Sequence, residues 1–587
     1  MRTIKDLSVP KTYSVSFDGF KGYSDGEQSD GKTVTYAENI SDSLFPSLSP
    51  RPRRAVLGKY GRITSFLADE TPVRIENYIL FVGDTQVSNE KFPDYYRHSI
   101  LRIGNYYVVL PRGFYVNVSD ITDCGFINRI VSVGNGGNVK LITVDGSYQE
   151  ITEYTVSRTR PPAAEAGDLW AKPKDVGGYE MKRYDGYEWR PYESYVRIEY
   201  SSLSEKFKIG DVLECTGAQD VLGPYVKVCH ADSTGIYFEG AAPQLTVINY
   251  FALKRLMPQL QHATVSGGRI VGVFCGRDDE GNPISKAYAS AVNDPFCWFE
   301  AYGGLSADIG GETPFTAIEG FGEDTVAFRE NSITRIKVSN DKISFSVTEC
   351  EGVASGGELS TAYINGSVYY KSPTGVYAYG GSFPKKISAP LGEAEVCDGS
   401  TPGGVYDGKY YIRLKDKKGR SHIYVYNTLS GGWSIEDDPG VTEFVQKNRG
   451  LIAVCEDGDG SFLVLWDHDG ASESLKGCYA KDGYPIVEKP IRWFFETGEV
   501  YADIGKGYFP SRVFLKARLK AGGSISVGCI CNGGSVPDKT VNVTDRTDTY
   551  FEIPMLVSRC TSLRLRVSGR GNAEVLGYVI EYAKETV

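Results

Sequence analysis

Several features typical of membrane proteins and metalloenzymes are scarce in this sequence. Its 587 residues include 4 methionines and 5 histidines. No run of 18 apolar residues occurs, so we expect no membrane-spanning helix. The start, MRTIKDLSVPKTYSVSF, lacks the apolar core of a signal peptide, so none is expected. No histidine has another His or Cys at short ligand spacing, so we assign no metal or general-base role to His98, His230, His262, His422 or His468.

An excess of positive charge is also missing. The formal net charge is −10 at pH 7, and the pI is about 5.3. Proteins that hold nucleic acid by its phosphates usually carry the opposite sign. Tight DNA binding over a large face is therefore not expected, whereas a surface that DNA passes without adhering is compatible with this charge.

Cysteine is present, but without the spacing of a zinc site. There are 12 cysteines, no C-x-x-C pair, and one close pair, Cys529 and Cys531. Alternate residues of a strand point to the same face, so we expect both to lie on one core face rather than to bind metal. We also expect the thiols to be reduced, as in a cytosol.

Motifs of enzymes are missing as well. No G-x-S-x-G elbow lies between a strand and a helix, and neither a P-loop nor the S-x-D-x-G-x-T-W turn of sialidases occurs. The acidic turns RDDEGNP and EDGDGS lack the ligand pattern of an EF-hand. We therefore predict a protein that is not an enzyme, with no cofactor and no catalytic, cofactor-binding or metal-ligating residue. Because 74 residues are acidic, the carboxylate pair of a glycan-cleaving enzyme stays open as an alternative.

Glycine and tyrosine are abundant, with 67 and 40 copies. Glycine marks turns and tyrosine suits half-buried strands, so the composition favours an all-β chain. Hairpin-like segments such as GSVYYKSPTGVYAYGG (Gly366 to Gly381) and RGLIAVCEDGDGSFLVLWDHD (Arg449 to Asp469) recur. From Gly268 onward their spacing is roughly 40 to 55 residues, with about four strands per unit. This period predicts a β-propeller of six or seven blades.

The regular spacing of the hairpin-like segments is interrupted twice along the sequence. We predict an inserted small β domain at 133–260, with a short helix at 249–260, and a C-terminal β-sandwich at 485–587. In the sandwich, LRLRV should place Leu563, Leu565 and Val567 on one face. The propeller blades then fall at 55–132 and 261–484.

The segment ENISDSLFPSLSPRPRR, Glu38 to Arg54, is rich in proline. Proline favours extended chain and cannot join a central strand, so we predict an extended N-terminal arm at 1–54. Its candidate partner-docking residues are Arg51, Arg53 and Arg54, which could grip an acidic neighbouring protein. The alternative is that the arm crosses its own domain and staples the propeller closed.

This segment belongs to a set of loose motifs that resemble tail structural proteins of phages and prophages. FDGFKGYS followed by AENISDSLFPSLSPRPRR resembles their N-terminus. ISKAYASAVNDPFCWF, TGVYAYGGSFPKKIS and GDLWAKP with YDGYEW are similar to their internal modules. FEIPMLVSRCTSLRLRVSGRGNAEVLGYVIEY is similar to their terminal sandwich, although it has LVSRC where P-R-R is commoner.

The resemblance implies a virion structural protein, similar to the propeller-bearing tail nozzle or hub of short-tailed phages, the packaged-DNA stabilisation proteins. Such a protein would form a homo-oligomeric, hexameric ring below the portal and adaptor. It would line and gate the DNA exit channel without binding DNA specifically, contact other tail proteins and seat tail fibres. It would be located in the virion tail after assembly in the bacterial cytoplasm. The alternative is a receptor- or glycan-binding tail or baseplate protein that uses aromatic residues at the propeller rim.

Overall fold

The computed structural model describes residues 11–24, 30–95, 97–134, 136–278, 281–392, 401–416, 418–447, 450–458, 460–501, 507–542, 547–555 and 559–584. The described chain is all-β, as predicted. Residues 1–10 of the predicted arm and 556–558 of the C-terminal motif lie outside the described residues. Among the described residues, no helix is long and apolar enough to cross a membrane. The helices are α1 (Ser201–Lys206), α2 (Gln219–Leu222) and α3 (Glu473–Tyr479), with 3-10 turns η1 (Glu300–Tyr302), η2 (Glu358–Ser360) and η3 (Ala389–Leu391).

Seven sheets built around four antiparallel strands make up the centre of the described molecule. Six of them follow chain order, and the seventh takes one strand from the N-terminal part of the chain. Their strands are β7 (Ile63–Leu67), β8 (Val73–Glu76), β9 (Ile79–Val82), β10 (Thr85–Lys91); β11 (Ser99–Ile103), β12 (Tyr106–Leu110), β13 (Phe114–Asn117), β14 (Cys124–Phe126); β27 (His262–Ser266), β28 (Arg269–Arg277), β29 (Pro283–Ala289), β30 (Leu305–Asp308); β31 (Ala317–Phe321), β32 (Asp324–Arg329), β33 (Ser332–Val338), β34 (Ile343–Glu349); β35 (Ala362–Ile364), β36 (Ser367–Ser372), β37 (Gly375–Tyr379), β38 (Lys385–Lys386); β39 (Gly403–Tyr406), β40 (Lys409–Lys415), β41 (Ser421–Asn427), β42 (Trp433–Asp437); and β43 (Val441–Lys447), β44 (Gly450–Asp457), β45 (Gly460–Leu465), β6 (Ala55–Gly61).

Local turn chemistry explains why these segments fold back on themselves. Asn365–Gly366 joins β35 to β36, and Asp407–Gly408 joins β39 to β40. All four residues have positive φ, between 48° and 77°. Two consecutive residues of this kind form the tight turn whose twist matches an antiparallel hairpin. The local sequence therefore accounts for both of these hairpin turns.

The seven sheets contact one another in cyclic order, and we call them the ring of sheets. The first strand of each sheet contacts the first strand of the next, and β43 of the last sheet contacts β7 of the first. An apolar core lies between each consecutive pair, including one shared by the last sheet and the first. The sheets are therefore buried on both faces, and every residue of β32 (DTVAFR) is buried.

Strand β6 joins two parts of the chain that are about 400 residues apart. It pairs antiparallel with β45, from Gly61↔Gly460 to Ala55↔Leu465. The last sheet of the ring is thus completed by a strand that precedes the first sheet in the sequence. Its residue Leu57 is fully buried in the core between these two sheets.

A separate β module follows β14 and returns the chain to β27. One eight-stranded sheet contains β15 (Arg129–Val133), β16 (Gly137–Thr143), β21 (Ser194–Glu199), β22 (Val212–Thr216), β23 (Tyr225–Ala231), β24 (Gly235–Glu239), β25 (Val247–Ile248) and β26 (Phe251–Arg255), and a smaller sheet contains β17 (Thr155–Val156), β18 (Leu169–Pro173), β19 (Tyr179–Tyr184) and β20 (Trp189–Pro191). The helix expected at 249–260 is wrong. Phe251, Leu253 and Arg255 alternate as buried residues of β26, a period of two that a helix cannot produce.

Two sheets share one core at the C-terminal end of the chain. Their strands are β1 (Thr12–Asp18), β53 (Ala573–Lys584), β48 (Tyr508–Leu519) and β51 (Thr547–Pro554), and β2 (Gly22–Tyr23), β3 (Thr33–Glu38), β47 (Arg492–Thr497), β52 (Leu563–Arg570), β49 (Ser524–Cys531) and β50 (Gly534–Asn542). Leu563, Leu565 and Val567 lie buried on one face of β52, as predicted. Cys529 and Cys531 are both buried, also as predicted, but Cys531 is joined to Cys560 by a disulfide, which corrects the expectation of thiols alone.

The described N-terminal residues correct the prediction of a separate extended arm at 1–54. Strand β1 pairs along β53, and β3 pairs with β47. In β1, alternation turns Tyr13, Val15 and Phe17 toward the shared core. The segment then continues through β4 (Ile40–Ser41) and β5 (Ser49–Pro50), which extend the sheet of β42, while β46 (Ile486–Val487) pairs with β6. The segment is thus part of two folded units.

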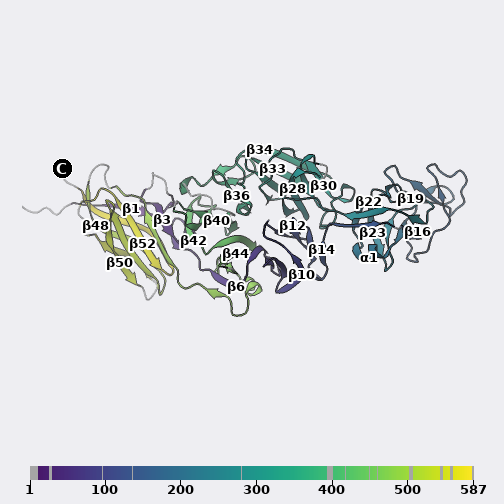
Figure 1. Cartoon of the computed structure of the whole chain (residues 1–587). Helices are drawn as coiled ribbons and strands as arrows, with labels where there is room; N and C mark the ends of the chain where they lie inside the picture. The colour runs from purple at the N-terminus through teal and green to yellow at the C-terminus, as the bar shows by residue number, and fades with distance from the viewer. Residues whose placement is uncertain are drawn as a thin grey trace, which may run out of the picture.

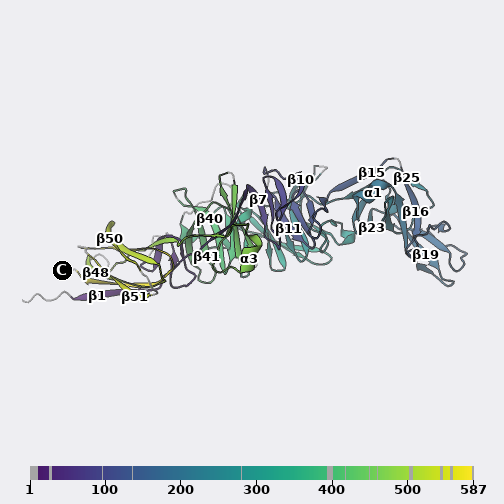
Figure 2. The same ribbon diagram turned by 90° about the horizontal axis from the view of Figure 1, so that it is seen from below.

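The described molecule is elongated. In Figure 1 the C-terminal pair of sheets lies at one end, the ring of sheets in the middle and the inserted module at the other end. Figure 2, seen from below, shows the same order, with β19 at the far end of the inserted module.

Because Leu57 of β6 packs between the last and first sheets, Leu57→Ala is predicted to lower the stability of the fold strongly. The substitution removes buried apolar volume between the last and first sheets, and we expect a loss of about 2–5 kcal/mol of stability. Leu429→Ala is the matched control, because Leu429 is 87% exposed and its loss should change stability by about 0.5 kcal/mol or less. Thermal unfolding by calorimetry measures both variants, and equal melting temperatures would contradict the role of β6.

Candidate functional site

The three arginines predicted to dock a partner occupy different environments. Arg51 and Arg54 have 2% and 3% of their side chains exposed, whereas Arg53 has 39%. Arg53 forms a surface ion pair with Asp469 at 2.8 Å. Arg51 and Arg54 are thus not available to an acidic partner, which corrects their assignment as docking residues; their acidic partners lie in the same chain. Of the three, Arg53 is the one that remains open to a partner.

Arg51, Arg54, Glu436, Asp437 and Glu488 form a cluster that we call the arginine node, in which Arg51, Arg54 and Glu436 are buried and Asp437 and Glu488 are partly exposed. Arg51 donates from Nη1 and Nη2 to Glu488 at 2.8 and 3.1 Å. Arg54 donates to Glu436 at 2.7 Å, and both arginines pair with Asp437. The Arg54 guanidinium also lies 3.6 Å from the ring centre of Trp466. The node therefore connects the N-terminal segment, the end of β42 and the segment after β46.

Asn39 has a left-handed backbone conformation, and its side chain orients the arginine node. Its φ is 60°, a value that asparagine tolerates better than most residues. Its side-chain oxygen accepts from Arg51 Nε at 2.9 Å and from the Asp437 N–H at 3.1 Å. Its amide donates to the Arg492 carbonyl at 3.2 Å, in β47 of the C-terminal pair of sheets. One asparagine thus holds three chain segments together.

A cavity of about 730 Å³ lies where the first strands of the ring of sheets converge, and we call it the axial cavity. Its wall includes residues of β7, β11, β27, β31, β39 and β43 and the residue before β35. Exposed residues Pro314, Ser355 and Gly356 belong to the same lining, so the cavity reaches the surface there. Its charged or titratable side chains are Arg97, His262, Glu319, Glu358 and Glu443.

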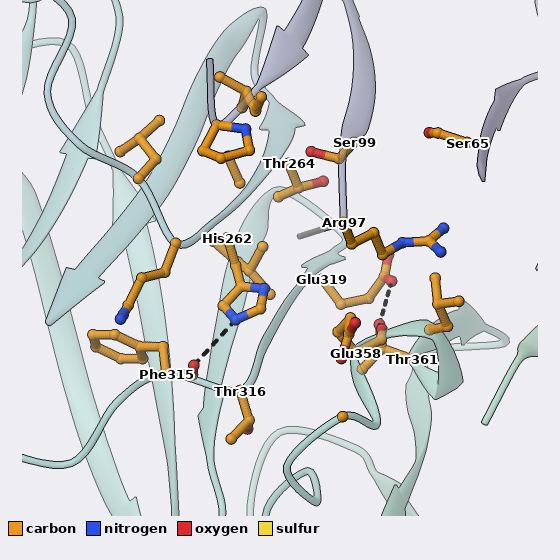
Figure 3. Close-up of a pocket in the computed structure, with 18 of the residues that line it drawn as sticks. Ser65, Arg97, Ser99, His262, Thr264, Phe315, Thr316, Glu319, Glu358 and Thr361 are labelled. Carbon is orange, nitrogen blue, oxygen red and sulfur yellow. Dashed lines mark hydrogen bonds between the residues drawn. The ribbon is translucent and has the colours of Figure 1, made fainter. Parts of the chain in front are cut away.

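Two hydrogen bonds drawn in Figure 3 define the polar side of this cavity. Thr361 Oγ1 donates to one carboxylate oxygen of Glu319 at 3.1 Å. The other carboxylate oxygen of Glu319 accepts the Gly320 N–H at 3.1 Å. His262 Nε2 lies 3.1 Å from the Phe315 carbonyl, to which it donates. Arg97 pairs with Glu443 at 2.8 Å. Glu319 and Glu358 have no cationic partner within ion-pair distance among the described residues.

Enclosure shifts the titration of several of these groups. Burial raises the pKa of Glu319 to about 7, although its hydrogen bonds from Thr361 and Gly320 oppose the shift. Burial lowers the pKa of His262, with the charge of Glu358 acting in the opposite direction. Burial also raises the pKa of Glu443 against the effect of Arg97. At neutral pH the cavity wall therefore contains both a carboxyl that can gain or lose a proton, Glu319, and a neutral imidazole, His262.

Sequence reasoning did not identify the axial cavity. His262 was one of five histidines without a motif, and Glu319 lies in an ordinary strand, AIEGF. The cavity groups come from positions as distant as Arg97 and Glu443, so no local spacing could have indicated them. Among the described residues, no group of three or more His, Cys, Asp or Glu is placed to hold a metal ion.

Comparison with known proteins gives no family for this chain. No family model matches the sequence, and no curated protein matches it. The solved structures that it resembles include an acylaminoacyl peptidase of Pyrococcus horikoshii, with 14% identity, TM-score 0.25 and 56% of each chain covered. An exo-β-1,3-galactanase of Phanerochaete chrysosporium has 8% identity and TM-score 0.18, with 77% of this chain and 100% of that chain covered. The Cry8Ea1 delta-endotoxin of Bacillus thuringiensis has 12% identity and TM-score 0.13, over 46% and 52%. At these TM-scores the likenesses carry no argument about fold or function.

The arginine node predicts unequal effects of two arginine substitutions. Arg54→Ala leaves Glu436, whose side chain is 4% exposed, without its cation, and we expect a loss of about 3–5 kcal/mol. Arg53→Ala removes an exposed pair and should cost about 1 kcal/mol or less. Melting temperatures of the two variants test this difference. A loss for Arg53→Ala as large as that for Arg54→Ala would show that leaving Glu436 unpaired is not the cause of the destabilisation.

Because its pKa is raised, Glu319 is predicted to destabilise the folded state to an extent that depends on pH. Its ordinary pKa is 4.5, and the fold raises it to about 7. Between these values the folded state retains a proton that the unfolded state has released, so the contribution of Glu319 to stability falls as the pH rises through this window and levels off above it. Relative to wild type, Glu319→Gln should therefore become progressively more stable from about pH 4.5 to about pH 7.

Melting temperatures of both proteins across this pH range test the expectation. Glu323→Gln is the control, because Glu323 is exposed in the turn between β31 and β32 of the same sheet. A constant offset between Glu319→Gln and wild type at all pH values would rule out the penalty.

Proposed function

We propose that the ring of sheets is a seven-bladed β-propeller, with an inserted β module and a C-terminal β-sandwich completed by N-terminal strands. The cyclic contacts of the seven first strands support this architecture, as do the seven cores between neighbouring sheets. Pairing of β6 with β45 would fasten the last blade, since it ties the two ends of the propeller segment into one sheet. The sequence period allowed six or seven blades, and the sheet order favours seven.

We further propose that the protein is a structural component of a phage tail, a nozzle or hub ring below the portal and adaptor. The observation that carries this proposal is the structural use of the N-terminal motif. Asn39, Pro50 and Arg51, which belong to the stretch resembling phage tail proteins, join the C-terminal module to the ring of sheets through β4, β5 and the arginine node. The residues of the resemblance are thus among those that join the two modules, which supports the proposal.

The two ends of the elongated molecule offer surfaces for assembly. Large apolar side chains are exposed in the inserted module and in the C-terminal module, and they include Val176, Tyr187, Tyr250, Tyr501, Phe509 and Tyr550. Exposed aromatic residues are typical of protein interfaces. In a ring of copies these ends would contact neighbouring subunits, the portal side and distal tail proteins, while the net negative charge would let DNA pass along the channel without adhering.

A specific observation also favours the alternative of receptor or glycan binding. Tyr187 is 90% exposed at the turn between β19 and β20, beside Trp189, which packs against Trp170 and Tyr184. This turn lies at the far end of the inserted module (Figure 2). Aromatic rings at a protruding tip can stack on sugar faces, and such a tip suits a peripheral position on a virion.

Electron microscopy of the intact particle, with this chain located by a label, separates the two functions. The structural proposal predicts a closed ring of copies on the tail axis beneath the portal, six in the hexameric form. Copies placed as peripheral spikes would overturn it and favour receptor binding, with Tyr187 as the residue to replace next. The isolated chain is expected to be a monomer that assembles only with its neighbouring tail proteins.

A further inference from the structure

The axial cavity carries more negative charge than its own cations neutralise. Three carboxyl groups, Glu319, Glu358 and Glu443, lie in its wall with one arginine, Arg97. That arginine is paired with Glu443 at 2.8 Å. His262 supplies no compensating charge, because burial lowers its pKa and its Nε2–H is donated to the Phe315 carbonyl. Two carboxyl groups, Glu319 and Glu358, thus face the cavity without a cation among the described residues.

The cavity also has the shape and the hydrogen-bonding groups of a small-molecule site. Its volume of about 730 Å³ is far larger than a bare ion requires. The lining includes the apolar side chains of Phe444 and Leu260 and the hydroxyls of Thr264, Thr316 and Thr361, of which Thr316 and Thr361 also donate to Phe328 and Glu319. Exposed residues at Pro314 and Ser355–Gly356 provide a route from solvent. Figure 3 shows Glu319, Glu358 and His262 reaching this space from separate elements.

The chemistry of the wall selects the class of ligand. Unpaired carboxylates in an enclosed site attract a cation that donates charge-assisted hydrogen bonds. A metal ion is disfavoured, because no group of three or more His, Cys, Asp or Glu in the described part of the chain is placed to hold one. An ammonium group on a short aliphatic chain would pair with a carboxylate at its charged end and contact the apolar wall with its methylenes.

We propose that the axial cavity binds a small aliphatic amine through Glu319 and Glu358. This inference goes beyond the proposed tail function and does not depend on it. Glu319 is held in place by Gly320 and Thr361, and it pairs with one ammonium group. Glu358, at the start of η2, receives a second ammonium group or a hydroxyl of the ligand.

Proton binding at Glu319 would compete with the amine. The carboxyl is charged above its pKa of about 7 and neutral below it, so affinity should fall as the pH drops through that value. The other titratable or charged groups that face the cavity are Arg97, His262, Glu358 and Glu443. Arg97 and Glu443 lie 2.8 Å apart as an ion pair, and burial lowers the pKa of His262, so Glu319 should dominate the change.

Titration calorimetry of the full chain with 1,4-diaminobutane, one pH unit above the Glu319 pKa, tests the proposal. We expect saturable binding at one site, and a loss of affinity of roughly tenfold or more for Glu319→Gln and for Glu358→Gln. Both substitutions keep side-chain size, and melting temperatures check that the variants fold. Glu323→Gln is the matched control at an exposed position of the same sheet and should bind like wild type.

Three comparisons on the wild-type chain keep the test independent of the variants. 1,4-Butanediol has the same length without charge and should not bind, and Ca²⁺ should not displace the diamine. Affinity one pH unit below the Glu319 pKa should be weaker than one unit above it. Absence of saturable diamine binding, equal binding of butanediol, displacement by Ca²⁺, or full affinity in both Glu→Gln variants would each overturn the proposal.

Discussion

The closing pair of β6 and β45 is the constraint on which the rest of the architecture depends. A single four-stranded sheet with two apolar faces cannot be stable alone, because each face needs a neighbour. Six of the seven inter-sheet cores join sheets that follow one another along the chain, but the seventh joins the last to the first. That core contains Leu57 of β6 beside Ile452 and Leu463. The strand that closes the ring therefore also fixes where the N-terminal segment must run.

The course of that segment explains why buried charge is tolerated next to the closure. After β3 pairs with the C-terminal module, the chain has to reach β6 through β4 and β5, and it passes the ends of β42 and β46. Arg51 and Arg54 meet Glu436, Asp437 and Glu488 at this crossing. Buried ion pairs give little net stability compared with apolar packing, but a mispaired charge is costly. The node thus specifies the position of the C-terminal module relative to the ring more than it adds to total stability.

Local sequence patterns predicted the features of the fold that depend on residues close together in the sequence. The all-β class, the hairpin at Gly366 to Gly381 and the buried face of Leu563 and Leu565 all follow from residues a few positions apart. Long-range pairing could not be predicted in this way. Tyr13 pairs with Tyr582, and nothing in TYSVSFD names that partner. The charge of Arg51 likewise predicted an acidic neighbouring protein, whereas its acidic partners belong to the same chain, which charge alone does not indicate. Phe251 to Arg255 was misread because short apolar runs fit both periods.

The axial cavity results from the cyclic arrangement of the sheets. Like the long-range strand pairing, it could not be predicted from local sequence patterns. Six of the seven first strands contribute one to three residues each, and the segment before β35 contributes Thr361, so the lining is assembled from separate stretches of chain between Ser65 and Phe444. Side chains there cannot all be apolar and large, since seven strands converge on one space that remains open to water at Ser355 and Gly356. A carboxyl such as Glu319 can occupy this position because Gly320 and Thr361 satisfy its oxygens. Ring closure fixes the distances among these groups, so any loosening of β6 would disperse the charges that make the cavity selective for a cation.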